Sequence, residues 1–282
     1  MEYSKKNHYL SINYNYPENN FNIYRGNNYR SGRFRGRNNY PIGYHDEPNY
    51  LSTYYNNYYP IYKNNFYNPY MQNNSLYRKE KYINKEYPYL LDINKNNSNI
   101  LKEINTDCKF FIIKSFSEED IHKSIKYGVW SSSKYGNNIL SKAFNVTKEK
   151  GSFVYLFFSC NGSGRYVGVA KMSSPCDFNK IFDYWTQDNK WPGLFEVEWI
   201  FIKDVPFKEF KNIIITMKNG EIKPVFNARD IQEIPYEQAK KMLDIIEKYE
   251  NKNDILEQFE FYDIRQANYE RNMKIEKMKK DI

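Results

Sequence analysis

Three of the four tryptophans lie in polar stretches of the sequence, where an indole ring is unusual. Trp130 is followed by three serines, and Trp185 and Trp191 flank the hydrophilic segment TQDNK. An aromatic face in such a context either covers the edge of a hydrophobic core or stacks on a ligand, and three together favour a ligand. Trp199 lies in the largely apolar run FEVEWIFIK, which predicts a core position. The pattern therefore indicates binding by stacking.

The residues that catalysis or metal binding would need are missing from the same part of the chain. His122 is the single histidine after residue 100, so a nucleophile there lacks a plausible base. No HxE motif occurs together with the PCxxC motif that base deaminases require, and two glycines at 162 and 164 are too few for a phosphate loop. The three cysteines form no CxxC pair. We expect no catalytic residue, no metal and no cofactor, and hence no enzyme.

Composition divides the chain near residue 100. The first 100 residues hold 20 of the 29 tyrosines, and with 13 Lys/Arg against 7 Asp/Glu they carry +6 of the net charge of +8. A stretch rich in Asn and Tyr and poor in Leu and Val buries too little apolar surface to offset the cost of ordering the backbone. We expect a disordered low-complexity tail over residues 1–100 and a fold that begins near Leu101. The remainder is nearly neutral, so a phosphate site there must be a local cluster.

The tail allows two interpretations. It is either a linker without a specific role, or a segment for self-association and auxiliary RNA contact. The run from Arg30 to Arg37 resembles a degenerate RGG segment, which supports the second interpretation. Unpaired cysteines, no signal peptide and no apolar run of about 20 residues predict a soluble protein in the cytoplasm, with the nucleus as the alternative.

Short apolar runs and capping signals predict strands interspersed with helices after residue 100. Strands are expected over 109–114, 154–159, 166–172 and 195–203, with a hairpin connection across 161–164. Helices are expected after Ser117, over 237–249, and around Ile255, Phe259 and Tyr262. We expect an α/β (α+β) fold with a mixed, barrel-like β-sheet surrounded by helices, over 101–250, and a helical extension over 251–282.

From Phe110 to Tyr249 the chain resembles the YTH domain family, whose members read N6-methyladenosine in RNA. The resemblance is carried by FFIIKSFSEEDIHKSIKYGVWSSS, VYLFFSCNGSGRYVGVAKM, YWTQDNKW, FEVEWIFIKDVP and NARDIQEIP. The spellings SEEDIHKSIKYGVW, WTQD and ARDIQEIP are more similar to the cytoplasmic DF branch than to the nuclear DC branch. It implies a non-catalytic reader of methylated mRNA.

The resemblance also implies roles for individual residues. A cage around the methyl group is implied for three tryptophans: Trp130, Trp185 and Trp191. Contacts to the base edge, or support of the base, are implied for four residues: Phe116, Asp120, Ser131 and Asn161. A groove for the RNA backbone is implied for three: Lys114, Arg229 and Asp230. Phe116 stands where many relatives have Tyr, and five residues separate Trp185 from Trp191 where relatives usually have four, which makes Trp191 the least secure wall.

Each of these polar residues has an alternative explanation in terms of structure. Asp120 is the third residue after Ser117 and could belong to a capping box, and Asn161 could start a turn. Lys114 could be a solvated strand end, and Arg229 and Asp230 could form a surface ion pair.

The functional hypothesis is a reader that regulates mRNA stability or translation with decay or translation-repression proteins as partners. The alternative is a generic single-stranded RNA-binding or scaffold protein whose tail drives assembly.

Overall fold

The computed structural model describes residues 79, 81–93, 100–187, 190–217, 219–251 and 253–280. Residues 1–78 of the tail expected over 1–100, including the run from Arg30 to Arg37, lie outside this part of the chain. Within the described ranges, no helix is long and apolar enough to cross a membrane.

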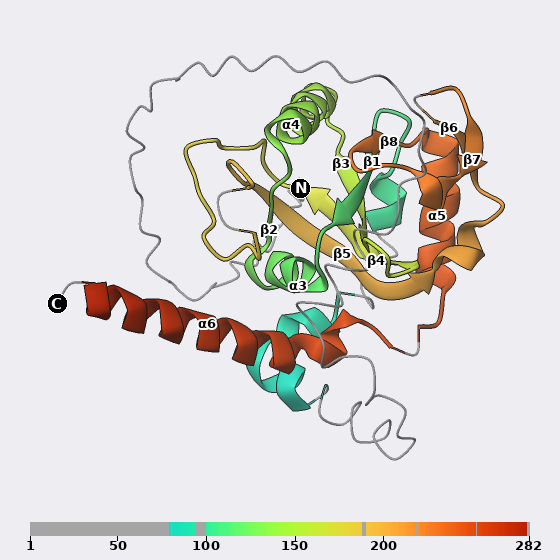
Figure 1. Ribbon diagram of the computed structural model, residues 1–282. Helices are drawn as coiled ribbons and strands as arrows, with labels where there is room; N and C mark the ends of the chain where they lie inside the picture. Colours follow the sequence, from blue (N-terminus) through green and yellow to red (C-terminus); the bar gives the residue numbers. More distant parts are fainter. Residues whose placement is uncertain are drawn as a thin grey trace, which may run out of the picture.

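A mixed six-stranded sheet, curled into a half barrel, forms the centre of the domain (Figure 1). Its strand order is β2-β5-β4-β3-β1-β8, and β1 and β3 run parallel while the other neighbours run antiparallel. The strands are β1 (Lys109–Ser115), β2 (Val129–Trp130), β3 (Val154–Cys160), β4 (Arg165–Met172), β5 (Phe195–Pro206) and β8 (Gln232–Glu233). A separate hairpin pairs β6 (Ile214–Thr216) with β7 (Ile222–Pro224). The expected mixed, barrel-like α/β fold is confirmed.

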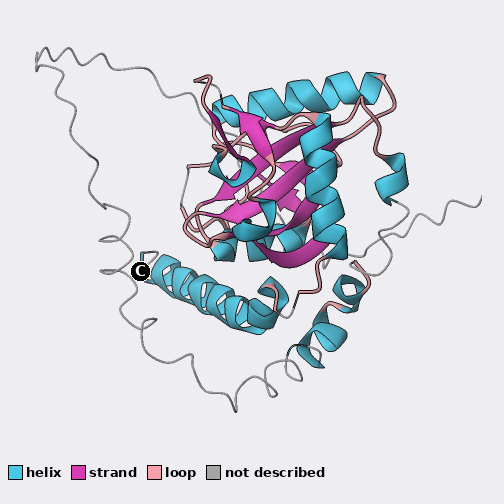
Figure 2. Cartoon of the chain, turned by 90° about the vertical axis from the view of Figure 1, so that its right-hand side faces the viewer, coloured by secondary structure: helices cyan, strands magenta, loops and turns pink. Residues whose placement is uncertain are grey.

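Helices cover both faces of the sheet (Figure 2). They are α3 (Glu118–Tyr127), α4 (Lys134–Glu149), α5 (Tyr236–Lys248) and α6 (Phe259–Lys280), with short 3-10 turns η1 (Pro88–Leu91), η2 (Ile100–Glu103), η3 (Phe207–Phe210), η4 (Val225–Asn227) and η5 (Ile255–Gln258). Helix α4 had not been predicted. Its sequence KYGNNILSKAFNVTKE is rich in residues of low helix propensity, and burial of Leu140 against the core compensates for them.

Two hydrophobic cores lie on opposite faces of the sheet. Alternate residues of β3 separate between them: Leu156 and Phe158 enter the core with α3, α4 and α6, whereas Tyr155 and Phe157 enter the core with α5. All seven residues of β3 are buried, as expected for a central strand covered on both faces.

Capping interactions fix the ends of α3. The backbone N–H of Asp120 donates to Ser117 Oγ (3.1 Å), and three acidic residues occupy the first turn, where the helix dipole favours them. Gly128 ends the helix with a φ of +63°, a left-handed conformation that glycine adopts without strain. The chain then enters β2 at once, which places Trp130 at a fixed distance from the helix.

The fold begins before the expected start near Leu101. Residues 81–86 are helical and lead into η1, and Ile83 and Leu90 are buried in the core that contains Phe259 of α6. The hydroxyls of Tyr82 and Tyr87 both donate to Asp263 Oδ2, at 2.7 Å each. Composition placed this segment in the tail because its apolar residues are few, but these few fit a surface that α6 provides.

Candidate functional site

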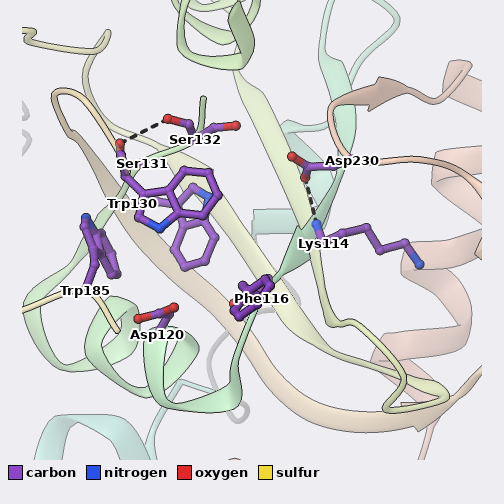
Figure 3. A pocket seen from close by; sticks show the side chains of 10 residues that line it. Lys114, Phe116, Asp120, Trp130, Ser131, Ser132, Trp185 and Asp230 are labelled. Carbon is purple, nitrogen blue, oxygen red and sulfur yellow. Dashed lines mark hydrogen bonds between the residues drawn. The ribbon is translucent and has the colours of Figure 1, made fainter. Parts of the chain in front are cut away.

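A pocket opens where the start of α3, the end of β2 and the loop before β5 meet (Figure 3). Its lining consists of Lys114, Ser115, Phe116, Asp120, Trp130, Ser131, Ser132, Trp185, Trp191 and Asp230. Eight of the ten residues predicted for the site are in this set, while Asn161 and Arg229 are not. The structure therefore brings together three tryptophans from separate parts of the chain.

Trp130 and Trp185 form two walls that the core holds in place. Each side chain is only 6% exposed, and their ring centroids lie 5.4 Å apart at an interplanar angle of 72°. Trp130 also packs edge-on against Phe158 at 5.0 Å, and Trp185 packs against Phe182 at 4.6 Å. The indole Nε1 of Trp185 is buried and has no hydrogen-bond partner among the described residues. Core contacts thus fix two perpendicular indole faces before any ligand arrives.

Trp191 is the more exposed third wall. It is partly buried against the same core, and the ammonium of Lys190 lies 4.7 Å from its ring centroid and 4.8 Å from that of Phe116. Lys190 thereby bridges two pocket-lining rings at the rim. Residues 188–189, which belong to the longer loop, lie outside the described part of the chain. The prediction that the extra residue loosens this wall remains a prediction.

Asp120 ties the tryptophan-bearing loop to α3. Its carboxylate is 3% exposed and accepts hydrogen bonds from the backbone N–H of Thr186 (2.8 Å) and from Thr186 Oγ1 (2.7 Å). Burial raises the pKa of Asp120, and the two hydrogen bonds from Thr186 oppose this shift. The residue both takes part in the N-terminal cap through its N–H and lines the pocket. Its clearest role in the structure is to position Trp185.

Asn137 supports the site and was missed by sequence analysis. It is fully buried in the first turn of α4, where its Oδ1 accepts from the Ser132 N–H (2.9 Å). Its Nδ2 donates to Ser131 Oγ (3.3 Å), Ser132 O (3.1 Å) and Pro192 O (2.7 Å). One amide therefore connects the residues after Trp130 to the residue after Trp191. An asparagine inside a helix start, where the propensity disfavours it, was the available signal.

Lys114 and Asp230, two of the residues expected to line a groove for the RNA backbone, lie side by side. The Lys114 backbone N–H donates to Asp230 Oδ1 (2.8 Å), and its ammonium donates to Phe226 O (3.2 Å) and lies 4.9 Å from the Phe207 ring centroid. Burial lowers the pKa of Lys114. The alternative explanation of Lys114 as a solvated strand end does not hold, because its side chain contacts protein.

Arg229 and Asn161 stand outside the pocket lining. Arg229 is exposed, and among the described residues no ion pair joins it to Asp230. Asn161 is exposed in the turn after β3, and its backbone N–H donates to the carbonyl of Ser115, a lining residue (3.0 Å). Asn161 therefore begins a turn that adjoins the pocket lining through its backbone.

Metal chemistry has no support in the described ranges. No group of three or more His, Cys, Asp or Glu side chains there could hold an ion. His122 points away from the pocket, since its Nε2 lies 3.2 Å from Asp263 Oδ1 on α6. What the pocket offers is aromatic faces, a few polar atoms and a cation at the rim.

The chain is similar in sequence to known proteins of one family. Residues 108–247 match the family model described as the YT521-B-like domain, YTH. YTH domain-containing protein ECT3 of Arabidopsis thaliana is 49% identical over 179 residues, covering 63% of this chain and 36% of that protein. YTH domain-containing family protein 1 of Mus musculus is 48% identical over 162 residues, covering 57% of this chain and 28% of that protein. The chain thus matches well under half the length of these relatives.

One solved structure with a similar sequence is the YTH domain of the Zygosaccharomyces rouxii MRB1 protein in complex with N6-methyladenosine RNA. It is 36% identical, with a TM-score of 0.47, and the match covers 52% of this chain and 92% of that one.

Proposed function

The chain belongs to the YTH family through residues 108–247, and on this premise we propose that it is a non-catalytic reader that binds single-stranded RNA at an N6-methylated adenine. The observation that carries the proposal is the convergence of Trp130, Trp185 and Trp191 on one pocket. An unpaired base can leave the strand, stack on an indole and be read along its edge. The methyl group then enters the angle between the walls.

The charges around the pocket favour a neutral methylated ligand over a methylated cation. Aromatic cages also bind methylated ammonium groups, where positive charge adds to the attraction. Here the lining carries two carboxylates, Asp120 and Asp230, and one ammonium, that of Lys114, and Lys190 adds a second positive charge at the rim. The formal charges therefore balance, so the site offers no net negative charge to a methylated cation, whereas Lys190 can attract the phosphates beside a neutral base.

The expected discrimination is modest. Burying one methyl group contributes about 0.8 kcal/mol, and contact of its weakly positive hydrogens with the indole faces adds to this. Since about 1.4 kcal/mol is a factor of ten, we expect roughly tenfold preference for the methylated base. Few phosphates are held, so affinity should be moderate and should fall with salt.

The cellular role follows from the resemblance to the DF branch and is part of the same proposal. We propose a cytoplasmic protein that regulates mRNA stability or translation, with decay or translation-repression proteins as partners and self-association through residues 1–100. We also propose that Asn161 and Arg229, which lie outside the pocket lining, contact the bound RNA strand.

The test is a titration of the full chain with paired nine-nucleotide RNAs that differ in one N6-methyl group. Trp191→Ala should remove much of the preference with little loss of stability, because this ring is only partly buried. Trp130→Ala should remove the preference entirely, although it also lowers stability by roughly 3–5 kcal/mol. Trp199→Phe, at a core tryptophan outside the lining, is the matched control and should keep the preference. Equal affinity of the unaltered chain for both RNAs would overturn the proposal.

A further inference from the structure

The first turn of α4, which begins two residues after Ser132 of the pocket lining, presents an aromatic ring to solvent. Ser132 lines the pocket, Ser133 caps the helix, and Lys134 and Tyr135 follow. The Tyr135 side chain is 72% exposed, more than any other aromatic side chain in the described ranges. An exposed ring offers a face on which a base can stack, and the closeness of Tyr135 to Ser132 in the chain makes a ligand bound in the pocket the relevant one.

The turn that carries Tyr135 is rigidly attached to the pocket. The backbone N–H of Gly136 donates to Ser133 Oγ (3.1 Å), and Asn137 binds both sides of the pocket as described above. A Cβ at Gly136 would collide with the Ser132 hydroxyl and lie 3.0 Å from Ile231, so the helix start packs too closely to shift. The backbone that carries Tyr135 is therefore held in place relative to Ser132 of the pocket lining, while the exposed ring is free to adjust to a ligand.

Two polar groups in the same stretch of chain, Ser132 and Lys134, suit a phosphate. The Ser132 hydroxyl is in a residue only 4% exposed and has no hydrogen-bond partner among the described residues. A buried hydroxyl without a partner carries a free-energy penalty that a ligand acceptor would remove. Lys134 adds an exposed positive charge, and the first turn of α4 contains no acidic residue, in contrast to the three in α3. A nucleotide is a ligand that uses a stacking face, a hydrogen-bond donor and a cation together.

We propose that the first turn of α4 is a second subsite, which stacks the base of a nucleotide adjacent to the methylated adenine on Tyr135. Ser132 and Lys134 bind the phosphate between the two nucleotides. Ser132 and Tyr135 are separated by at most about 10 Å of chain, the scale of one nucleotide step. The inference rests on the proposed function, because the methylated base anchors the strand.

The experiment is a double-mutant cycle between protein and RNA. The full chain and Tyr135→Ala are titrated with methylated nine-nucleotide RNAs that carry either all bases or one abasic position, placed on each side of the methylated adenine in turn. Base stacking on an aromatic ring contributes roughly 1–3 kcal/mol, so Tyr135→Ala should weaken binding about fivefold or more. For the abasic position on one side of the methylated adenine, the unaltered chain should bind the abasic RNA more weakly than the full RNA, by the same factor as Tyr135→Ala. Tyr135→Ala should bind that abasic RNA and the full RNA with equal affinity.

Three further variants separate stacking from charge and from general effects. Tyr135→Phe retains the ring and should bind like the unaltered chain. Tyr269→Ala, at an exposed tyrosine on α6, is the matched control and should also bind normally. Lys134→Gln should reduce the slope of log affinity against log salt by about one, which Tyr135→Ala should not do.

Failure of the subsite and failure of the reader function give different results. The subsite is wrong, while the methyl preference stands, if Tyr135→Ala binds RNA normally. It is also wrong if the loss of affinity in Tyr135→Ala adds in full to the loss caused by an abasic position, whichever side of the methylated adenine carries that position. If the unaltered chain does not prefer methylated RNA at all, the reader function is wrong and the subsite is overturned with it.

Discussion

Helix α3 faces two different neighbours, and the two sides are held in different ways. On the pocket side, Asp120 makes two hydrogen bonds to Thr186 of a loop. On the opposite side, Asp263 of α6 accepts from Lys126 of α3 and from two tyrosines of the segment before the domain, and lies close to His122. Helix α3 is therefore anchored through several elements on the side away from the pocket. On the pocket side, Asp120 and the N-cap residue Ser117 both bind one residue of the loop, Thr186.

The pKa values of Asp120 and Asp263 are shifted in opposite directions, as the difference between the two sides of α3 would suggest. Burial raises the pKa of Asp120. Burial also opposes the ionisation of Asp263, but His122, Lys126 and Tyr82 outweigh it and hold its pKa far below the usual range. The ionised form of Asp263 is therefore strongly favoured in the folded protein. We expect substitutions on the anchor side to change stability, and substitutions on the pocket side to change RNA recognition.

The largest effect should come from Asp263→Ala. Removing the acceptor leaves the Lys126 ammonium and two tyrosine hydroxyls without it, and breaking such a partly buried charged cluster typically costs about 3–5 kcal/mol. Urea denaturation should show the loss of unfolding free energy, while the ratio of affinities for methylated and plain RNA stays unchanged. Glu276→Ala, at an exposed position of the same helix, should change neither. A changed affinity ratio in Asp263→Ala would break the proposed separation.

An intermediate effect is expected for Asp120→Ala. The Thr186 N–H and hydroxyl lose a shared acceptor, which should lower stability by about 2 kcal/mol. Because Trp185 adjoins Thr186, the methyl preference should fall most of the way toward equality in the paired titration. Thr186→Val removes one of the two bonds and should give a smaller change in the same direction. An unchanged preference in Asp120→Ala would show that core contacts alone position Trp185.

The smallest effect concerns pH and the anchor side. Burial lowers the pKa of His122, so the folded state holds it neutral while the unfolded chain binds a proton below about pH 6.5. Its contribution to stability is therefore complete above that pH and is lost as the pH falls. Asp204 titrates in the same pH range, because burial raises its pKa to about 7. Its protonation in the folded state makes the protein more stable as the pH falls, which opposes the effect of His122.

The effect of His122 is therefore measured as the difference in unfolding free energy between the unaltered chain and a His122 variant, because Asp204 contributes equally to both. The unfolding free energy of the full chain and of His122→Gln is compared at several values between pH 7.5 and 5.5. The unaltered chain should lose more stability on acidification than the variant. Parallel curves would contradict the role of His122.

The sequence predicted those parts of the fold that local patterns determine. The strands β1, β3, β4 and β5 were found because their apolar and β-branched runs are long enough to be distinctive. Trp130 and Trp185 could be predicted as pocket residues because a large aromatic side chain is unusual in a polar stretch of sequence. The cap at Ser117 was found from the residue types alone.

Features made by distant contacts could not be predicted in the same way. Asn137 acts through groups as far away as Pro192, and the bond between Asp120 and Thr186 joins residues 66 positions apart. The helical segment around Ile83 has a composition typical of a tail and is ordered by α6. In each case the partner is distant in the sequence, so a pattern of neighbouring residues cannot predict it.

The placement of β8 has a consequence for the time course of synthesis. This last strand pairs with β1, the first, and Asp230, which precedes it, borders the pocket. On the ribosome the three tryptophans emerge well before Asp230, and Asp263 follows later still. A nascent chain therefore cannot complete the pocket until residues 230–233 have left the exit tunnel, and α3 gains its anchor only after that. Recognition of RNA should therefore begin only after residues 230–233 have been synthesised.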